Sequence, residues 1–121
     1  MKRRSKYGAV PTVIDNIRFA SAKEARRYGE LKLLLKAGEI RNLELQPRFP
    51  LRVSRSNIQT NMPETLLGEY VGDFQYEERD NALGYDCWPR IVEDVKGFKT
   101  PLYRWKKKHV EAQYGIQIRE I

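Results

Sequence analysis

The feature that most constrains the fold of this chain is a strand, a helix and a second strand in close succession at its C-terminal end. The segment RIVEDVK (90–96) has the apolar frame of a strand. Residues 100–115 read as a helix that Thr100 can cap and Gly115 can stop. Residues 116–121, IQIREI, read as a last short strand. Because strands joined through a helix usually run parallel, this order predicts a parallel pair at one side of a mixed sheet.

A second helix is predicted over residues 21–40. Ser21 and Glu24 have the spacing of a capping box, and Gly38 can end the helix in the left-handed conformation. Apolar residues recur at helical spacing along one face: Ala25, Tyr28, Leu31, Leu34 and Leu35. Glu24 falls on this stripe, so its side chain starts on the inward face at the first turn.

Two segments between the helices alternate as strands do, and each is expected to form one strand: residues 43–53 and residues 67–78. Pro47 and Pro50 mark the first as an edge strand or an interrupted one. In the second, one side is expected to hold Tyr70, Gly72, Phe74 and Tyr76. Asp73 then faces the other side.

The order of elements defines the expected fold class. Residues 12–19 read as a small hairpin that turns at Asp15-Asn16, and a helix, three strands, a helix and a strand follow it. This order predicts an α/β sandwich with a mixed sheet of about five strands flanked by helices. We assign residues 11–121 to one domain and residues 1–10 to a basic, flexible arm that carries Lys2, Arg3, Arg4 and Lys6.

Composition narrows the function classes. The formal net charge of +7 favours a polyanionic partner, of which nucleic acid is the commonest. One cysteine, Cys87, allows no internal disulfide, which fits a reducing cytoplasm. One thiol and one histidine cannot form a zinc cage, and no long apolar run follows the basic N-terminus as a signal peptide or membrane span would require.

A cluster of charged groups is predicted where the strands of residues 67–78 and 90–96 pair. Asp94 and Lys96 face together, Glu93 faces the opposite side, and pairing can bring Asp73 beside Asp94. Mg²⁺ would offset the repulsion of the two carboxylates and could also bind the carbonyl group of Val95. The same residues also allow a plainer interpretation, in which Asp94 and Lys96 form an ordinary ion pair on a solvated strand.

The four charged residues resemble the signature of the PD-(D/E)XK nuclease superfamily. Glu24 stands in SAKEARRY, Asp73 in YVGDFQY, and Asp94 with Lys96 in VEDVKG. Nearly the whole chain also resembles a small, mostly bacteriophage-encoded family, domain of unknown function 1064. The shared sequence motifs include F.S.KEARRY.EL.LL..AGEI..LE.QP.F and VEDVKG.

This resemblance implies an αβββαβ restriction-endonuclease-like core and a Mg²⁺- or Mn²⁺-dependent endonuclease. In its terms Asp73, Asp94 and the Val95 carbonyl would bind metal, and Lys96 would orient or activate the attacking water. Glu24 would bind a second metal or position a water, unless it only caps its helix, and Gln46 would lie near the site. Two departures are Gly72 where the signature often has proline, and Glu93, which a strand bulge would exchange with Asp94 as the ligand.

The implied substrate is DNA. The second helix and its approach carry Lys99, Arg104, Lys106, Lys107, Lys108 and His109, which suit phosphate contacts without base reading. Tyr103 and Trp105 are expected to pack in the core rather than stack on bases. The leading hypothesis is a structure-selective endonuclease of the Holliday-junction-resolvase kind, phage-encoded and acting in the bacterial cytoplasm, with a homodimer as one arrangement. The alternatives are a less selective nickase or nuclease that acts on host DNA, and a non-catalytic DNA-binding protein with the same fold.

Overall fold

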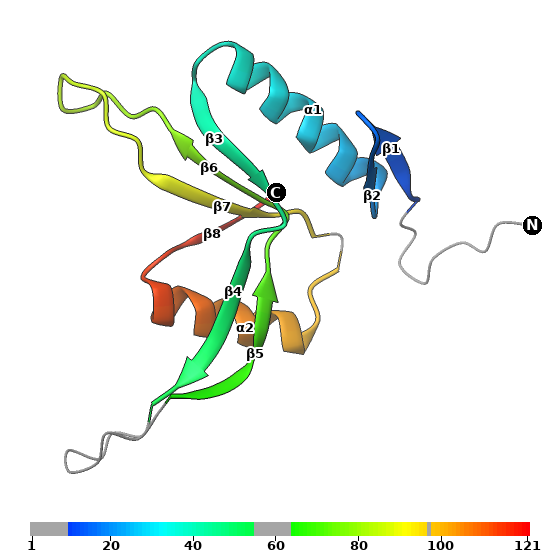
Figure 1. The fold of residues 1–121 in the computed structure, drawn as a ribbon, viewed down its shortest axis with the longest axis vertical. Helices are drawn as coiled ribbons and strands as arrows, with labels where there is room; N and C mark the ends of the chain where they lie inside the picture. The colour runs from blue at the N-terminus through cyan, green and yellow to red at the C-terminus, as the bar shows by residue number, and fades with distance from the viewer. Residues whose placement is uncertain (1–9, 55–63, 97) are drawn as a thin grey trace, which may run out of the picture.

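The computed structural model describes residues 10–54, 64–96 and 98–121 of the chain. In these residues the chain forms eight short strands and two helices (Figure 1). In chain order they are β1 (Thr12–Ile14), β2 (Ile17–Phe19), α1 (Ala22–Lys36), β3 (Ile40–Leu45), β4 (Arg48–Val53), β5 (Thr65–Val71), β6 (Phe74–Glu78), β7 (Arg90–Asp94), α2 (Pro101–Tyr114) and β8 (Ile118–Glu120).

The central sheet has four strands, in the order β3-β6-β7-β8, rather than the five or so expected. β6 pairs antiparallel with both β3 and β7, whereas β7 and β8 run parallel. The parallel pair joined by α2, which the sequence predicts, is therefore confirmed. The N-terminal hairpin is also confirmed: β1 pairs with β2, and Asp15 and Asn16 have φ values of 52° and 62°, as a tight hairpin turn requires.

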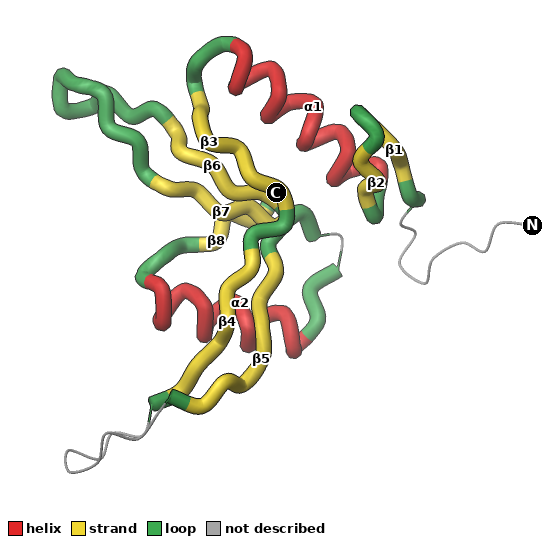
Figure 2. The backbone as a smooth tube through the Cα atoms, in the orientation of Figure 1, coloured by secondary structure: helices red, strands yellow, loops and turns green. Residues whose placement is uncertain are grey.

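The two long strands expected from the sequence are each broken into two. Residues 43–53 divide at Gln46-Pro47 into β3 and β4, and residues 67–78 divide at Gly72-Asp73 into β5 and β6. β4 and β5 then form their own two-stranded antiparallel ladder, which we call the β4–β5 arm (Figure 2). Gln46, with φ of 50°, and the proline after it interrupt the ladder, which is why the alternating pattern does not continue as one strand.

Main-chain hydrogen bonds join the two breaks. The Gln46 amide donates to the Asp73 carbonyl over 3.0 Å, and the Gly72 amide donates to the Pro47 carbonyl over 3.0 Å. Both long segments therefore bend at the same level, one beside the other. A Cβ atom on Gly72 would lie 3.1 Å from Cγ1 of Val92 and 3.2 Å from Cγ of Pro47, so the close approach of β7 at this level requires glycine.

The bend divides the hydrophobic core in two, one part under each helix. The α1 core comprises Phe19, Ala25, Tyr28, Leu31, Ile40, Phe74 and Tyr76. The α2 core comprises Phe49, Leu51, Tyr70, Val92, Tyr103, Val110 and Ile118. The expectation that Tyr70, Phe74 and Tyr76 share one side is therefore wrong, because the bend carries the chain from the α2 core to the α1 core between Tyr70 and Phe74.

The capping signals place the start of α1 correctly, but the predicted range 21–40 is too long, since α1 ends at Lys36 and Ile40 begins β3. The Ser21 hydroxyl accepts a hydrogen bond from the Glu24 amide over 3.1 Å, and Gly38, with φ of 78°, lies just beyond the end of the helix. The buried residues of α1 are Glu24, Ala25, Tyr28 and Leu31. Leu34 remains 36% exposed, so its assignment to the buried stripe is wrong; the core contacts a narrower face than the stripe predicts.

α2 also begins and ends as predicted. The Thr100 hydroxyl accepts a hydrogen bond from the Tyr103 amide over 3.1 Å, and Gly115 has a left-handed φ of 63°. Tyr103 is buried, as expected. Trp105 is 49% exposed, so the expectation that it packs in the core is wrong; it lies instead beside His109, with ring centroids 5.4 Å apart.

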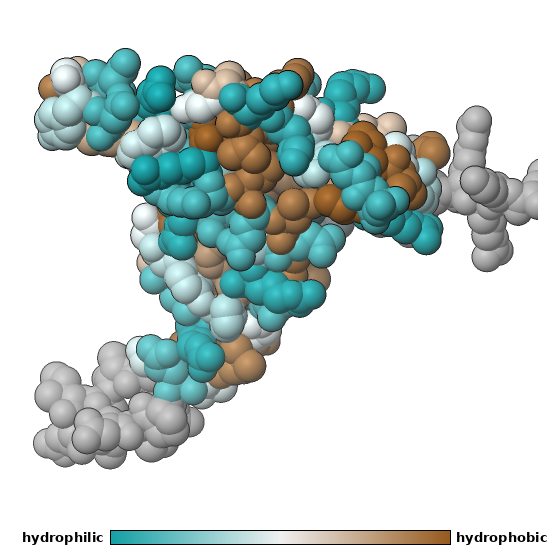
Figure 3. Space-filling view, turned by 45° about the horizontal axis from the view of Figure 1, so that its top comes forward, coloured by the Kyte–Doolittle hydropathy of each residue, from teal (hydrophilic) through white to brown (hydrophobic). Residues whose placement is uncertain are grey.

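Exposed apolar side chains occur on several elements rather than on one. Examples are Leu33 on α1, Leu66 on β5, Leu83 in the loop between β6 and β7, and Leu102 on α2. Figure 3 shows one face, on which apolar side chains gather in the middle among hydrophilic ones. Within the described ranges, no helix is both long and apolar enough to cross a membrane.

Candidate active site

Three carboxyl groups and one amine from three segments of the chain meet at the bend of the sheet. Glu24 lies in the first turn of α1, Asp73 between β5 and β6, Asp94 at the end of β7, and Lys96 two residues beyond it. The negative charges of Glu24 and Asp94 raise the pKa of Asp73, and the positive charge of Lys96 lowers the pKa of Glu24. The structure thus brings together the four residues that the sequence singles out.

Asp94 is the most deeply buried member of this cluster, with 1% of its surface exposed. The Tyr70 hydroxyl donates a hydrogen bond to Oδ2 of Asp94. The Lys96 ammonium lies 3.2 Å from Oδ1, yet in the described residues this oxygen receives no hydrogen bond. Asp94 therefore keeps one buried oxygen with an ionic neighbour and no hydrogen-bond donor, which is uncommon for a buried carboxylate.

Asp73 is held by the chain around it. Its Oδ2 atom accepts a hydrogen bond from the Val95 amide over 2.6 Å, and its own amide donates to the Glu93 carbonyl over 3.0 Å. Burial raises the pKa of Asp73 to about 7, and the charges of Asp94 and Glu24 act in the same direction against the Val95 hydrogen bond. Asp73 can therefore change its protonation state near neutral pH.

Glu24 contributes to the cluster through its side chain and to the helix cap through its main chain. Its amide makes the capping hydrogen bond to Ser21, and the residue as a whole is 9% exposed. Burial, followed by the charge of Asp94, raises the pKa of Glu24, whereas Lys96 and a hydrogen bond with Asp73 lower it. Capping alone therefore does not account for Glu24; its role toward a metal stays a prediction.

The adjacent acids Glu93 and Asp94 point to opposite faces of β7. Glu93 is fully buried on the α1 side, where Arg27 and Tyr76 hydrogen-bond to it, whereas Asp94 lies on the α2 side with Tyr70. The alternation expected from the sequence is observed, and no register shift occurs in the pairing of β7 with β6.

Two predicted site residues approach the cluster through main-chain atoms. Gln46 contacts Asp73 through its amide, and its exposed side chain lies on the surface. Val95 contacts Asp73 through its N–H group, whereas the prediction concerned its carbonyl group. The catalytic role of Gln46 and the metal role of Val95 stay predictions.

The carboxylate oxygens of the cluster are the possible ligands for a hard divalent ion. In the described part of the chain, no three His, Cys, Asp or Glu side chains are grouped so as to hold a metal ion. Asp73 and Asp94 nevertheless offer carboxylate oxygens, and the Asp94 oxygen without a hydrogen-bond donor is the kind of atom an ion would satisfy. These residues fit an ion held by two carboxylates, with water completing its coordination, as Mg²⁺ commonly accepts.

Several basic residues of α2 and of the segment before it pair within the protein. Lys106 donates to the Glu69 carbonyl over 3.0 Å, and both Lys99 and Lys107 pair with Glu120, at 3.1 Å and 3.4 Å. Exposed residues among the predicted phosphate contacts include Arg104 and Lys108. Both line a shallow hollow of about 300 Å³ together with Lys99, Tyr103, Lys107 and Glu120. His109 contacts the Arg52 carbonyl instead. The predicted arm residues Lys2, Arg3, Arg4 and Lys6 lie outside the described residues.

Sequence reasoning missed three side chains that organise the site: Arg27, Tyr70 and Tyr76. Each hydrogen-bonds to one of the adjacent acids in β7. Their positions gave no local signal, because an aromatic residue in a strand and an arginine in a helix are ordinary there. A pairing of Glu93 with Arg27, 66 positions apart, becomes visible only when α1 is placed on the sheet.

The fold and the site define a mixed α/β protein with a cluster of buried acids at a bend in its sheet. The chain belongs to the family described as "protein of unknown function (DUF1064)", whose model matches residues 4–120. Neither the search of curated proteins nor the search of solved structures gave a significant match.

Proposed function

We propose that this protein is a Mg²⁺- or Mn²⁺-dependent DNA endonuclease of the PD-(D/E)XK superfamily. The observation that carries the proposal is the convergence of Glu24, Asp73 and Asp94 with Lys96 in one partly buried cluster. Buried like charges are costly unless a cation or a proton offsets them, so such a cluster favours function over stability.

The order of elements supports the same superfamily. If β3 with β4 and β5 with β6 are each counted as one bent strand, the order after the hairpin is helix, three strands, helix and strand. This order agrees with an αβββαβ restriction-endonuclease-like core. The bend between β5 and β6 then corresponds to the point at which that core carries its first metal-binding acid, here Asp73.

Each side chain has a distinct task in this proposal. Asp73 and Asp94 hold the divalent ion, which when bound lowers the pKa of a water molecule and neutralises charge on the scissile phosphate. Lys96, whose ammonium lies 3.2 Å from Asp94 Oδ1, orients or activates the attacking water. Glu24 positions a water or binds a second ion.

The proposed substrate is branched DNA, such as a four-way junction processed during phage replication, recombination or packaging. The net charge of +7 and the exposed Arg104 and Lys108 on α2 support a phosphate-rich partner. Preference for branched DNA rests on the resemblance to resolvases, which cut symmetric strands as two-fold dimers. A homodimer is therefore part of the proposal.

A non-catalytic DNA-binding protein is the second candidate. The observation that favours it is the Lys96–Asp94 ion pair, which already supplies a cation to the buried carboxylate. In that case the protein would bind DNA with the same basic surface and leave it intact under every metal condition.

One experiment separates the two candidates. The protein is incubated with plasmid, single-stranded DNA and a synthetic four-way junction, in Mg²⁺, Mn²⁺ or EDTA. We expect metal-dependent cutting, preferentially of the junction, that Asp94→Asn abolishes without loss of DNA binding. Lys96→Ala should slow cutting on the order of a hundredfold or more.

The matched control is Glu77→Gln, which neutralises a carboxylate on β6 that pairs with Arg41 on the surface. It should cut at the wild-type rate. Binding without cutting by the wild-type protein in every metal would support the non-catalytic candidate.

A further inference from the structure

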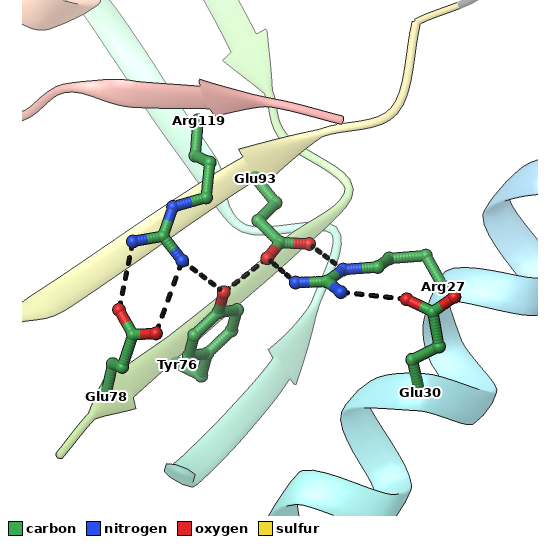
Figure 4. Close-up of polar contacts among 6 residues, drawn as sticks. All are labelled: Arg27, Glu30, Tyr76, Glu78, Glu93 and Arg119. Atoms are coloured by element: carbon green, nitrogen blue, oxygen red, sulfur yellow. Dashed lines mark hydrogen bonds and ion pairs between the residues drawn. The ribbon is translucent and has the colours of Figure 1, made fainter. Parts of the chain in front are cut away.

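A chain of polar contacts crosses the α1 side of the sheet next to the carboxylate cluster. Figure 4 shows it running from α1 through β7 and β6 to β8. Its members are Glu30, Arg27, Glu93, Tyr76, Arg119 and Glu78. None of these residues is among the four of the candidate site.

The centre of this chain is a buried ion pair with two parallel hydrogen bonds. Nε of Arg27 donates to Oε1 of Glu93 over 2.8 Å, and Nη2 donates to Oε2 over 2.6 Å. The Tyr76 hydroxyl also donates to Oε2, so the fully buried carboxylate has three hydrogen-bond donors. This fork geometry fixes both the distance and the orientation of the two side chains.

The ion pair joins two elements that otherwise meet little. The backbone of α1 lies closest to β3 and to the N-terminal hairpin, rather than to β7. The Arg27–Glu93 pair is therefore a direct polar link that sets how α1 sits relative to β7. A buried ion pair generally adds less stability than a well-packed apolar pair would, so its geometry is the more informative property.

Arg27 and Glu93 both lie close in the chain to residues of the candidate site. Arg27 follows Glu24 by three residues, one turn of α1, and Glu93 directly precedes Asp94. We infer that Arg27 and Glu93 are a positioning pair, which holds the Glu24 carboxyl group in place relative to Asp94 and Asp73. This inference rests on the proposed function for its link to metal binding, but not for the placement of α1.

The test uses a variant that avoids an unpaired buried charge. Arg27→Met combined with Glu93→Gln removes both charges together and leaves an amide to which Tyr76 can donate. Mn²⁺ affinity is measured by calorimetry, junction cutting by gel, and unfolding by urea. We expect a folded protein with about 10–100-fold weaker Mn²⁺ binding, the usual loss when a residue that orients ligands is removed.

The matched control is Arg41→Met, the same change in an exposed arginine that also pairs with a glutamate, Glu77. It should leave Mn²⁺ affinity unchanged. Arg27→Lys alone should keep most of the wild-type stability but lose Mn²⁺ affinity. Lysine can still pair with Glu93 as a point charge, but it cannot hold both of its oxygens.

A double-mutant cycle separates positioning from general stability. If the pair acts through Glu24, then Arg27→Met with Glu93→Gln should cost no further Mn²⁺ affinity in a protein that already carries Glu24→Gln. Losses that simply add, or an unchanged Mn²⁺ affinity in the folded Arg27→Met, Glu93→Gln protein, would overturn the inference.

Failure of the proposed function gives a different result. If the wild-type protein neither binds Mn²⁺ nor cuts DNA, the endonuclease proposal fails, and hydrogen exchange of amides 22–28 then decides the inference. Faster exchange of these amides in the Arg27→Met, Glu93→Gln protein, but not in Arg41→Met, would show that the pair holds the first turns of α1. Equal exchange in both would overturn it.

Discussion

The hydroxyl group of Tyr70 in β5 donates a hydrogen bond to Oδ2 of Asp94 in β7, inside the α2 core. Burial and the neighbouring Asp94 raise the pKa of Tyr70, so the hydroxyl stays a donor at any physiological pH. The β4–β5 arm thus contacts the buried acid of the candidate site through Tyr70.

Removing this hydroxyl should affect both stability and activity. Tyr70→Phe leaves a buried carboxylate oxygen without its donor, so we expect the free energy of unfolding to fall by about 1–3 kcal/mol, measured in urea. Cutting should slow as well, because Asp94 loses one of the contacts that orient it. Tyr85→Phe, at a tyrosine that is 63% exposed, should change neither quantity.

The raised pKa of Asp73 predicts a pH-dependent stability. The folded protein holds this proton up to about pH 7, whereas the unfolded chain releases it near the ordinary value of 3.8. The contribution of Asp73 to stability is therefore fully present below about pH 4 and is lost as the pH rises through about 7. Asp73→Asn should gain stability relative to the wild type over this range. A constant difference between the two proteins from pH 4 to pH 8, measured by urea unfolding, would contradict the assignment.

A divalent ion should oppose the same loss. Mn²⁺ or Mg²⁺ that binds the folded protein alone raises its stability, by about 2.7 kcal/mol when the ion is at 100 times its dissociation constant. Protonated Asp73 competes with the ion, so the rise in melting temperature should be larger at pH 8 than at pH 6. Asp94→Asn should remove the effect, and Glu77→Gln should keep it. An equal rise in Asp94→Asn would place the ion elsewhere.

Gly72 should resist even the smallest substitution. The added Cβ atom of Gly72→Ala would lie 3.1 Å from Val92 and 3.2 Å from Pro47, and neither side chain can easily move away. We expect a loss of about 1–3 kcal/mol, since β7 must shift to make room. Gly68→Ala, where no atom lies within 4 Å of the added carbon, should cost nothing or add stability. Thermal unfolding of both variants checks the difference.

Removing the exposed basic residues of α2 should weaken DNA binding. Arg104→Ala with Lys108→Ala should weaken binding to all DNA sequences alike and make the salt dependence shallower, by about one unit of slope for each phosphate left without its cationic partner. Lys32→Ala with Lys36→Ala, two exposed lysines of α1, is the control. Unchanged affinity after the α2 substitutions would show that DNA follows another surface.

The charge pattern alone suggests that Lys106 contacts phosphate, but in the structure it bonds to the main chain of β5. Its ammonium donates to the Glu69 carbonyl of β5, so Lys106→Ala should loosen the packing of α2 against the β4–β5 arm. We expect lower stability with little change in the salt dependence of DNA binding. Urea unfolding and a salt titration of DNA affinity distinguish the two effects.

Local patterns in the sequence were sufficient to predict the local structure. Ser21 and Thr100 cap their helices, Asp15-Asn16 turns the hairpin, and the parallel pair of β7 and β8 follows from the intervening helix. The convergence of Asp73, Asp94 and Lys96 was predicted as well, although Asp73 and Lys96 lie just outside the strands in which they were expected.

Non-local relations could not be predicted in the same way. Alternation gives the period of a strand but not its continuity, so the breaks at Gln46-Pro47 and Gly72-Asp73 were missed. The partners of the adjacent acids in β7 were missed for a related reason. Arg27 and Tyr70 meet Glu93 and Asp94 only after the helix and the arm are placed in space.

The two main-chain hydrogen bonds at the bend enclose Asp73 between them, one on its carbonyl and one on the amide of Gly72. The bend is therefore the point at which the β4–β5 arm leaves the central sheet. Because Tyr70 belongs to this arm and its hydroxyl group bonds to Asp94, a change in the angle of the arm would alter the surroundings of that carboxylate.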